Sequence, residues 1–220
     1  LGLKIYIYDE NSYPSGFAGG HVPSQLPDCL ANSIVMRRLD RRTLAALAEN
    51  DSPMLNRPGH PVRAYACEEA AADGGRKIRL TRDLTEVPPA EWLRYGDTFL
   101  VFELGTPETN TWLGGFAYPD LLRPEVAELF LRTTYEPYAA RFGDRFGDAI
   151  PAVFTDEPEI SPGNLFRPGA DFLPFSYWFA AEFERRNGYD LKDCLPCLFL
   201  DAEWDPAAGG GPKLDPLKVR

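Results

Sequence analysis

The chain has 220 residues and a mass of 24.6 kDa, which suits one ordinary domain, or one and a half small ones. Its apolar fraction of 44% and charged fraction of 25% are those of a folded globular protein, so disordered, collagen-like and coiled-coil chains are excluded. A net charge of −10 argues against nucleic acid and anionic membranes as partners. No apolar run approaches the roughly 18 residues that a membrane-spanning helix needs.

The first element is an apolar run over residues 3–8 (LKIYIY), which predicts a buried strand. Two acids, Asp9 and Glu10, follow it directly and lead into the turn-rich stretch NSYPSGFAGG. A buried strand that ends in carboxylates and glycines is how barrels and open α/β sheets present active-site loops. Residues 40–49 then have helical character.

The pattern changes between about residues 61 and 104. Loose alternation in residues 62–67 and 77–81, and an apolar run at 99–104, predict a small antiparallel sheet of three or four strands. Gly74-Gly75 and Pro88-Pro89 are typical of turns between such strands. Because helical patterning resumes afterwards, we expect this sheet to be an insertion.

Residues 124–142 give the clearest helical pattern, with Pro137 expected to kink the helix. Residues 150–155 (IPAVFT) predict a further short buried strand. A second amphipathic helix is predicted over residues 175–187, ending at Gly188. Its expected core residues are Tyr177, Ala181 and Phe183. Strand, acidic loop and helix therefore recur, which indicates a parallel sheet covered by helices.

The acidic run Thr155-Asp156-Glu157-Pro158-Glu159 is the strongest chemical signal, because three carboxylates fall just after a predicted strand. Like charges at close range, and partial burial, raise carboxyl pKa values. A carboxylic acid that stays protonated near neutral pH can protonate a leaving oxygen, as glycoside hydrolysis requires, with a second carboxylate across the sugar. The alternative is that these acids are solvated and cap the following loop.

Two further stretches suit a polyhydroxylated ligand, because they combine carboxylates with aromatic rings. The residues concerned are Asp9, Glu10, Tyr13 and His21 in the first stretch, and Trp112 and Tyr118 in the second. The alternatives are a glycine-rich turn with a capping acid, and core packing of Trp112. Asp120 is expected to cap the helix that begins near Pro124.

The chain has four cysteines, and only Cys194-Leu-Pro-Cys197 has a suggestive spacing. A lone CxxC is weak support for a redox or zinc site. Neither His21 nor His60 lies near a second such pair. We therefore favour small apolar side chains near a helix end.

Residues 8–20 (YDENSYPSGFAGG) resemble the YDE-x-x-[WY]-PSG-x-AGG stretch of large bacterial glycoside hydrolases related to family 106, the α-L-rhamnosidases. The similarity continues in YPDLLRPEV at 118–126 and in the FG, IP and FTDEP motifs between 142 and 158. It recurs in GYDL at 188–191 and in LPCL at 195–198. These stretches lie within residues 3–30 and 112–200.

The resemblance implies a (β/α)8 barrel that hydrolyses glycosidic bonds, with α-L-rhamnosides among the substrates. In related barrel hydrolases an Asn-Glu-Pro at the end of the fourth strand supplies the general acid, which implies this role for Glu157, with Asp156 in place of the Asn. The expected substrate-binding residues are Asp156, Asp9, Glu10, Tyr13, His21, Trp112 and Tyr118. Family members depend on Ca²⁺, for which Asp9 and Glu10 are the candidate ligands.

We therefore expect an α/β fold, a partial (β/α)8 barrel-like domain with an inserted small antiparallel β-sheet. The expected parts are residues 1–54 as the first part of the barrel, 55–106 as the insertion, 107–204 as the continuation and 205–220 as a loop. A barrel needs about 250 residues, so we expect only three barrel strands here, at 3–8, near 112–118 and at 150–155.

Because Leu1 is not Met and an apolar strand already begins at residue 3, we expect a fragment. The second catalytic carboxylate and the C-terminal part of the barrel would then lie outside this chain, and exposed strand edges would favour dimerisation. The expected partner is a carbohydrate substrate. Two alternatives stay open: a noncatalytic carbohydrate-binding relative, and an isolated small α/β domain without activity.

Overall fold

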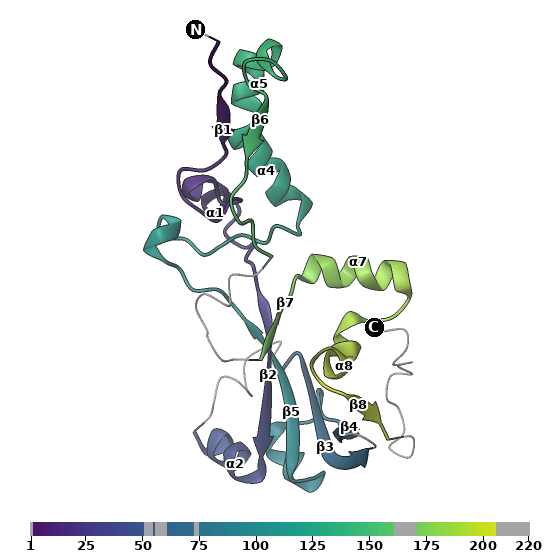
Figure 1. Ribbon diagram of the computed structural model, residues 1–220. Helices are drawn as coiled ribbons and strands as arrows, with labels where there is room; N and C mark the ends of the chain where they lie inside the picture. The colour runs from purple at the N-terminus through teal and green to yellow at the C-terminus, as the bar shows by residue number, and fades with distance from the viewer. Residues whose placement is uncertain (1, 51–54, 56–60, 73–74, 161–170, 206–220) are drawn as a thin grey trace. The chain divides into compact units, whose positions relative to one another are not determined.

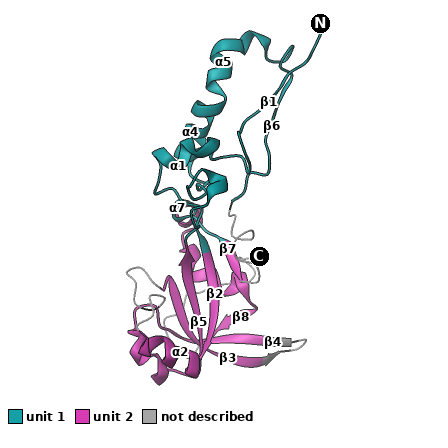
Figure 2. Cartoon of the chain, turned by 90° about the vertical axis from the view of Figure 1, so that its left-hand side faces the viewer, with its two compact units in different colours: residues 1–33, 106–168, 174–179 teal, residues 34–105, 169–173, 180–220 magenta. Residues whose placement is uncertain are grey.

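The computed structural model describes residues 2–50, 55, 61–72, 75–160 and 171–205 (Figure 1). The chain divides into two compact units, which Figure 2 shows in different colours. Unit 1 contains residues 1–33, 106–168 and 174–179, and unit 2 contains residues 34–105, 169–173 and 180–220. Within the described residues, no helix combines the length and apolar character needed to cross a bilayer.

Unit 1 contains a two-stranded parallel sheet of β1 (Tyr6–Tyr8) and β6 (Ala152–Phe154), in which Ile7 lies opposite Val153. Both strands were expected to be buried, and this expectation is wrong. Ile7 is buried, but Tyr6 is 64% exposed and Phe154 55% exposed. The apolar run therefore identified the strands but overstated their burial, because within the described residues β1 and β6 pair only with each other.

The helices of unit 1 are short. They are η1 (Ala18–Gly20), α1 (His21–Gln25), η3 (Thr111–Leu113), α4 (Pro124–Thr134), α5 (Glu136–Phe142) and η4 (Gly143–Arg145). The single helix predicted over 124–142 is divided at Tyr135. The reason is Pro137, which has no N–H to donate to the carbonyl of Thr133 and lies instead in the first turn of α5.

The core of unit 1 consists of two small apolar clusters. The first contains Ala18, Val22, Cys29, Val126 and Leu129, and the second Phe17, Ala31, Leu113 and Tyr118. The strand expected near 112–118 is absent, since η3 occupies the start of this stretch. Asp120 is buried and accepts a hydrogen bond from the N–H of Leu122, so it caps the turn before α4, whose N-cap is Arg123.

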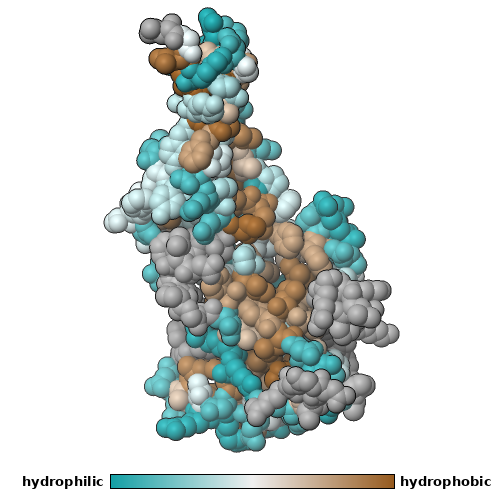
Figure 3. All heavy atoms as spheres, in the orientation of Figure 1, coloured by the Kyte–Doolittle hydropathy of each residue, from teal (hydrophilic) through white to brown (hydrophobic). Residues whose placement is uncertain are grey.

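Unit 2 is built on a curled six-stranded mixed sheet with the order β7-β2-β5-β3-β4-β8 (Figure 1). The strands are β2 (Ser33–Asp40), β3 (Arg63–Ala72), β4 (Gly75–Asp83), β5 (Thr98–Gly105), β7 (Phe172–Pro174) and β8 (Ala202–Trp204). Strand β3 is antiparallel to β4 and β5, whereas β4 and β8 are parallel. Figure 3 shows apolar side chains gathered over β7 and the adjoining part of this sheet.

The antiparallel strands predicted at 62–67, 77–81 and 99–104 are confirmed as β3, β4 and β5. The predicted turn residue Gly74 lies outside the described residues. Helix α2 (Arg41–Glu49) matches the predicted helical stretch, and the Asp40 carboxylate caps it by accepting the Thr43 N–H at 2.7 Å.

The main core of unit 2 lies between its sheet, α2 and η2 (Pro89–Arg94). Its buried members are Leu39, Leu44, Leu55, Ala64, Ala66, Leu84, Trp92, Phe99 and Val101. Trp92 has no exposed surface, and its indole N–H donates to the carbonyl of Val87 at 2.8 Å. This bond satisfies the one polar atom that the buried indole side chain carries.

Helix α7 (Tyr177–Asn187) ends as predicted at Gly188, whose φ of 77° is favourable only for glycine. The predicted core role of Tyr177 and Ala181 is wrong, because both are exposed and the buried residue of this helix is Ala180.

The Cys194–Cys197 pair lies at η5 (Leu191–Cys194) and α8 (Leu195–Phe199), and both thiols are free. Burial raises the pKa of Cys194 to about 11. A raised pKa disfavours the thiolate that redox and zinc chemistry require.

The predicted partial (β/α)8 barrel is wrong. The chain folds into the curled mixed sheet of unit 2, which resembles half of a barrel, and the small parallel sheet of unit 1, with few helices between strands. Two of the predicted barrel strands are only three residues long and the third is absent. An apolar run forms a buried parallel strand only when helices cover both faces of its sheet. Most side chains of β1 and β6 remain exposed.

Candidate functional site

Every site residue predicted from the sequence lies in unit 1. They come from the segments after β1 and β6, from the start of α1 and from the region of η3 and the turn after it. Two reciprocal hydrogen bonds join the first two segments. The Ser15 N–H donates to the Asp156 carbonyl at 2.7 Å, and the Asp156 N–H donates to Ser15 Oγ at 2.9 Å. The acidic ends of both strands therefore lie together.

Asp9 is 4% exposed, and both of its carboxylate oxygens are hydrogen-bonded within the protein. Its carboxylate accepts bonds from Ser15 Oγ at 2.6 Å, the Tyr135 hydroxyl at 2.7 Å and Thr155 Oγ1 at 3.0 Å. These donors come from the loop after β1, the junction of α4 and α5, and the end of β6. Asp9 therefore ties three segments together, and three of the roughly four acceptor positions of its carboxylate are already used.

Glu10 organises the glycine-rich loop that follows it. Its carboxylate accepts backbone N–H bonds from Gly16 at 2.9 Å, Ala18 at 2.7 Å and Gly19 at 2.9 Å. Ala18 and Gly19 have φ values of 50° and 60°, which turn successive N–H groups inward around an anion. Burial raises the pKa of Glu10, and the three N–H bonds oppose that rise.

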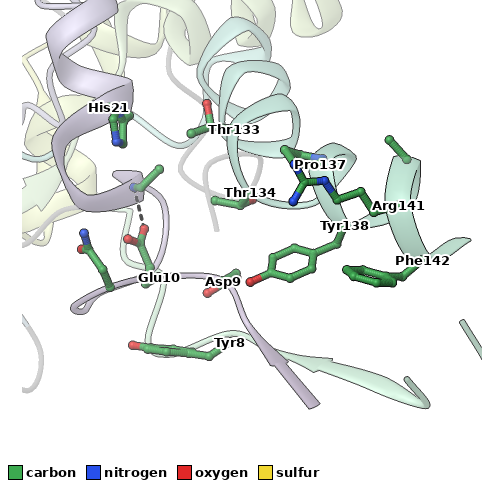
Figure 4. Close-up of a pocket in the computed structure, with 13 residues that line it drawn as sticks. Tyr8, Asp9, Glu10, His21, Thr133, Thr134, Pro137, Tyr138, Arg141 and Phe142 are labelled. Carbon is green, nitrogen blue, oxygen red and sulfur yellow. Dashed lines mark hydrogen bonds between the residues drawn. The ribbon is translucent and has the colours of Figure 1, made fainter. Parts of the chain in front are cut away.

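A cavity of about 610 Å³ lies beside these two acids (Figure 4). Buried Asp9 and Ala18 contribute to its inner surface. One wall consists of Thr133, Thr134, Pro137, Tyr138, Ala140, Arg141 and Phe142, and the other includes Tyr8, Asn11 and His21. The predicted residues Asp9, Glu10 and His21 therefore line one cavity, whereas Tyr13, Trp112, Tyr118, Asp156 and Glu157 do not.

The wall from α4 and α5 was not predicted from the sequence. Arg141 and Phe142 lie three and four residues after Tyr138, which places the three side chains on one side of a helix. From the sequence, residues 124–142 were predicted only as a kinked helix, and no ligand-facing residue was assigned to them. The available signal was Arg141, a charged residue close to aromatic ones.

Trp112 and Tyr13 form an exposed aromatic pair. Their ring centroids are 5.5 Å apart in an edge-to-face arrangement, and the Trp112 indole N–H donates to the Tyr13 carbonyl at 2.5 Å. Trp112 is 57% exposed and Tyr13 42% exposed. Their ring surfaces are therefore accessible to a ligand.

Tyr118, which was predicted to line a subsite, is fully buried. Its hydroxyl donates to the Ser15 carbonyl and accepts the Glu159 N–H at 3.3 Å. Burial raises the pKa of Tyr118 well above its ordinary value. Tyr118 is therefore a structural support for both loops and does not contact solvent.

Glu157 has a left-handed backbone with φ of 43°, which is strained for a residue other than glycine, at a cost of about 1–2 kcal/mol. Its side chain is exposed, and it forms no hydrogen bond or ion pair with the described residues. Two residues later, Glu159 is half-buried, and burial together with the charge of Glu157 raises its pKa. Glu159 was not singled out from the sequence, although the acidic run contains it.

The expected Ca²⁺ ligands do not fit that role. Calcium takes six to eight oxygen ligands, whereas the carboxylates of Asp9 and Glu10 already accept hydrogen bonds from hydroxyl and backbone N–H groups. The part of the chain that the structure describes also contains no group of three or more His, Cys, Asp or Glu residues that could hold a metal ion.

Comparison of the chain with protein-family models, with curated proteins and with solved structures finds no match in any of the three. The similarity to family 106 glycoside hydrolases therefore stays a prediction from short motifs. Unit 1 carries a strained exposed glutamate, a neighbouring glutamate with a raised pKa, an exposed aromatic pair and, lined by other residues, a cavity.

Proposed function

We propose that unit 1 carries a carbohydrate site and that Glu157 protonates the leaving oxygen of a glycosidic bond, as in glycoside hydrolases related to family 106. The observation that carries this proposal is the left-handed backbone of Glu157. Such strain persists only where the surrounding structure imposes it, and it is concentrated at functional sites.

The strain at Glu157 is imposed from both sides. Asp156 is held through its N–H and its carbonyl by Ser15, and the Glu159 N–H is held by the buried Tyr118 hydroxyl. In addition, the residue before a proline normally takes an extended backbone, and Glu157 precedes Pro158. These contacts fix the position of a side chain that nothing else in the described residues binds.

The aromatic pair supports a sugar as the ligand. Tyr13 lies two residues before Ser15, and Ser15 is hydrogen-bonded to Asp156, the residue before Glu157. The exposed rings of Tyr13 and Trp112 are therefore connected to Glu157 through this contact between the two loops. Aromatic rings present flat apolar faces, on which the apolar faces of sugar rings can stack.

The second glutamate supports acid catalysis. Burial, and then the charge of Glu157, raise the pKa of Glu159. The Glu159 carboxyl group therefore retains its proton to a higher pH than an isolated carboxyl group. A retained proton is what a general acid needs to act toward neutral pH.

The test compares Glu157→Gln with the matched variant Glu159→Gln on a panel of aryl glycosides that includes α-L-rhamnosides. We expect Glu157→Gln to lower kcat by at least about 100-fold, since general acid catalysis contributes roughly 10²–10⁴-fold. Glu159→Gln should keep turnover and shift the pH profile. Unchanged turnover in Glu157→Gln, with circular dichroism confirming the fold of both variants, would overturn the assignment.

Carbohydrate binding without turnover is the second candidate function. It is favoured by one observation: the carboxylates of Asp9 and Glu10, beside the cavity, are already hydrogen-bonded within the protein. No second free carboxylate therefore faces the cavity from this segment. Calorimetric binding of a glycoside that wild-type protein does not hydrolyse, with the same affinity in Glu157→Gln, would support it.

A further inference from the structure

We propose that the cavity of unit 1 binds an acidic sugar, a pyranose ring with one carboxylate, and that Arg141 binds this carboxylate. This inference rests on the proposed carbohydrate function of unit 1 and gives the class of sugar that the cavity binds, a cavity that Glu157 itself does not line. It differs from the neutral rhamnosides that the sequence resemblance implies.

Most polar groups that line the cavity are already hydrogen-bonded within the chain. The carboxylates of Asp9 and Glu10 accept three hydrogen bonds each from the chain itself. The hydroxyls of Thr133 and Thr134 donate to helix carbonyls one turn earlier, at 2.8 Å each. The donors that the described residues leave unused are therefore what an anionic ligand can bind here, and a carboxylate is the ligand group that only accepts hydrogen bonds.

Arg141 is the strongest of these donors. Figure 4 shows its side chain turned toward the space between α4 and the segment of Asp9 and Glu10. Within the described part of the chain it forms no ion pair or hydrogen bond, whereas the half-buried Arg63 of unit 2 binds both Asp190 and Asp193. A free guanidinium group matches a carboxylate with two parallel hydrogen bonds.

Aromatic rings line the same cavity as this guanidinium group. Tyr138 and Phe142 lie on the same helix as Arg141, Tyr8 lies on the opposite wall, and all three are exposed at the cavity. The Tyr138 hydroxyl points toward Asp9 in Figure 4. The volume of about 610 Å³ lies within the roughly 300–1,000 Å³ of small-molecule sites. Aromatic rings on both walls and one cation on the α5 wall suit a single charged sugar.

The same cavity limits how much negative charge the ligand carries. Asp9 and Glu10 remain close to the ligand, and they repel further anionic groups even though their oxygens are hydrogen-bonded. His21 contributes a positive charge only when it is protonated. One carboxylate at Arg141 is therefore favourable, whereas a polysulfated chain is not.

The experiment measures binding to the purified chain by calorimetry at low ionic strength. The probes are 4-nitrophenyl hexuronides of both anomeric configurations, the matching neutral hexosides, and 4-nitrophenyl α-L-rhamnoside. We expect one hexuronide to bind at least about tenfold more tightly than its neutral counterpart, and this preference to fall as salt is added. Arg141→Gln should abolish the preference.

Arg132→Gln is the matched control, because Arg132 is exposed on the neighbouring helix α4 and does not line the cavity. It should leave the preference unchanged. Equal binding of acidic and neutral sugars, or a preference that survives Arg141→Gln, would overturn the inference and leave the carbohydrate function standing. Binding of neither class would overturn both.

Discussion

The two units of the chain are stabilised in different ways. Unit 2 has a sheet against which large apolar side chains such as Trp92 and Phe99 are completely buried. Unit 1 has small apolar clusters and several buried polar residues, among them Asp9, Ser15 and Asp120. Satisfied polar networks fix positions more sharply than they stabilise a fold. The candidate site lies in the unit whose loops are held by such networks.

The carboxyl groups follow the same division. In unit 1 burial raises the pKa values of Glu10, Asp120 and Glu159. In unit 2 hydrogen bonds from Arg185 and Arg186 lower the pKa of Glu182 to about 2, and bonds from neighbouring groups lower those of Asp40 and Glu203. These three acids of unit 2 are thus hydrogen-bonded near its surface, whereas Glu10, Asp120 and Glu159 of unit 1 are kept partly out of water; Glu125 of unit 1, paired with Arg123, is an exception with a lowered pKa.

Replacement of a tryptophan in each unit should give the largest contrast. Trp92→Ala should lower the free energy of unfolding by about 3–5 kcal/mol, because a fully buried side chain leaves a cavity. Trp112→Ala should cost about 1 kcal/mol, since it removes one exposed edge contact and one hydrogen bond. Urea unfolding measures both values. Equal losses would show that the two tryptophans are comparably important for folding.

Removal of the Asp9 carboxylate tests the polar network of unit 1. Asp9→Ala leaves three hydroxyl donors without their acceptor, of which that of Ser15 is fully buried, so we expect a loss of about 3 kcal/mol. Thr155→Val is the matched control, because it removes one of these donors, and it should cost about 1 kcal/mol. If Asp9→Ala were no more destabilising than the control, the network would not hold unit 1 together.

The smallest contrast concerns pH. Because the folded pKa of Glu10 is raised, its stabilising contribution is present at acidic pH and is lost as the pH rises through that pKa. The opposite holds for Glu182, whose contribution is present above its ordinary value of 4.5 and is lost as the pH falls toward about 2. Carbon-13 NMR titration should therefore find Glu10 titrating above Glu182. Coinciding titrations would remove this difference between the units.

Local structure was predictable where neighbouring residues decide it. The antiparallel strands of unit 2 follow from alternation between turn residues, and α2 follows from its capping Asp40. The break before Pro137 follows from the missing N–H of proline. In the site, the role of Glu10 matches the alternative weighed from the sequence, a glycine-rich turn with a capping acid, because its carboxylate accepts N–H bonds from that loop.

The tertiary structure decided which of these residues are available to a ligand. The sequence could not show that the Asp9 carboxylate accepts hydrogen bonds within the protein, since its donors Tyr135 and Thr155 lie more than a hundred residues away along the chain. It could not show that Tyr118 is buried or that Glu157 is strained. Nor could it show whether apolar strands such as β1 are covered, because burial depends on what packs against a strand. The sequence thus determined the local elements and the chemistry of the acidic loops, whereas long-range packing determined the fold and the exposed side chains.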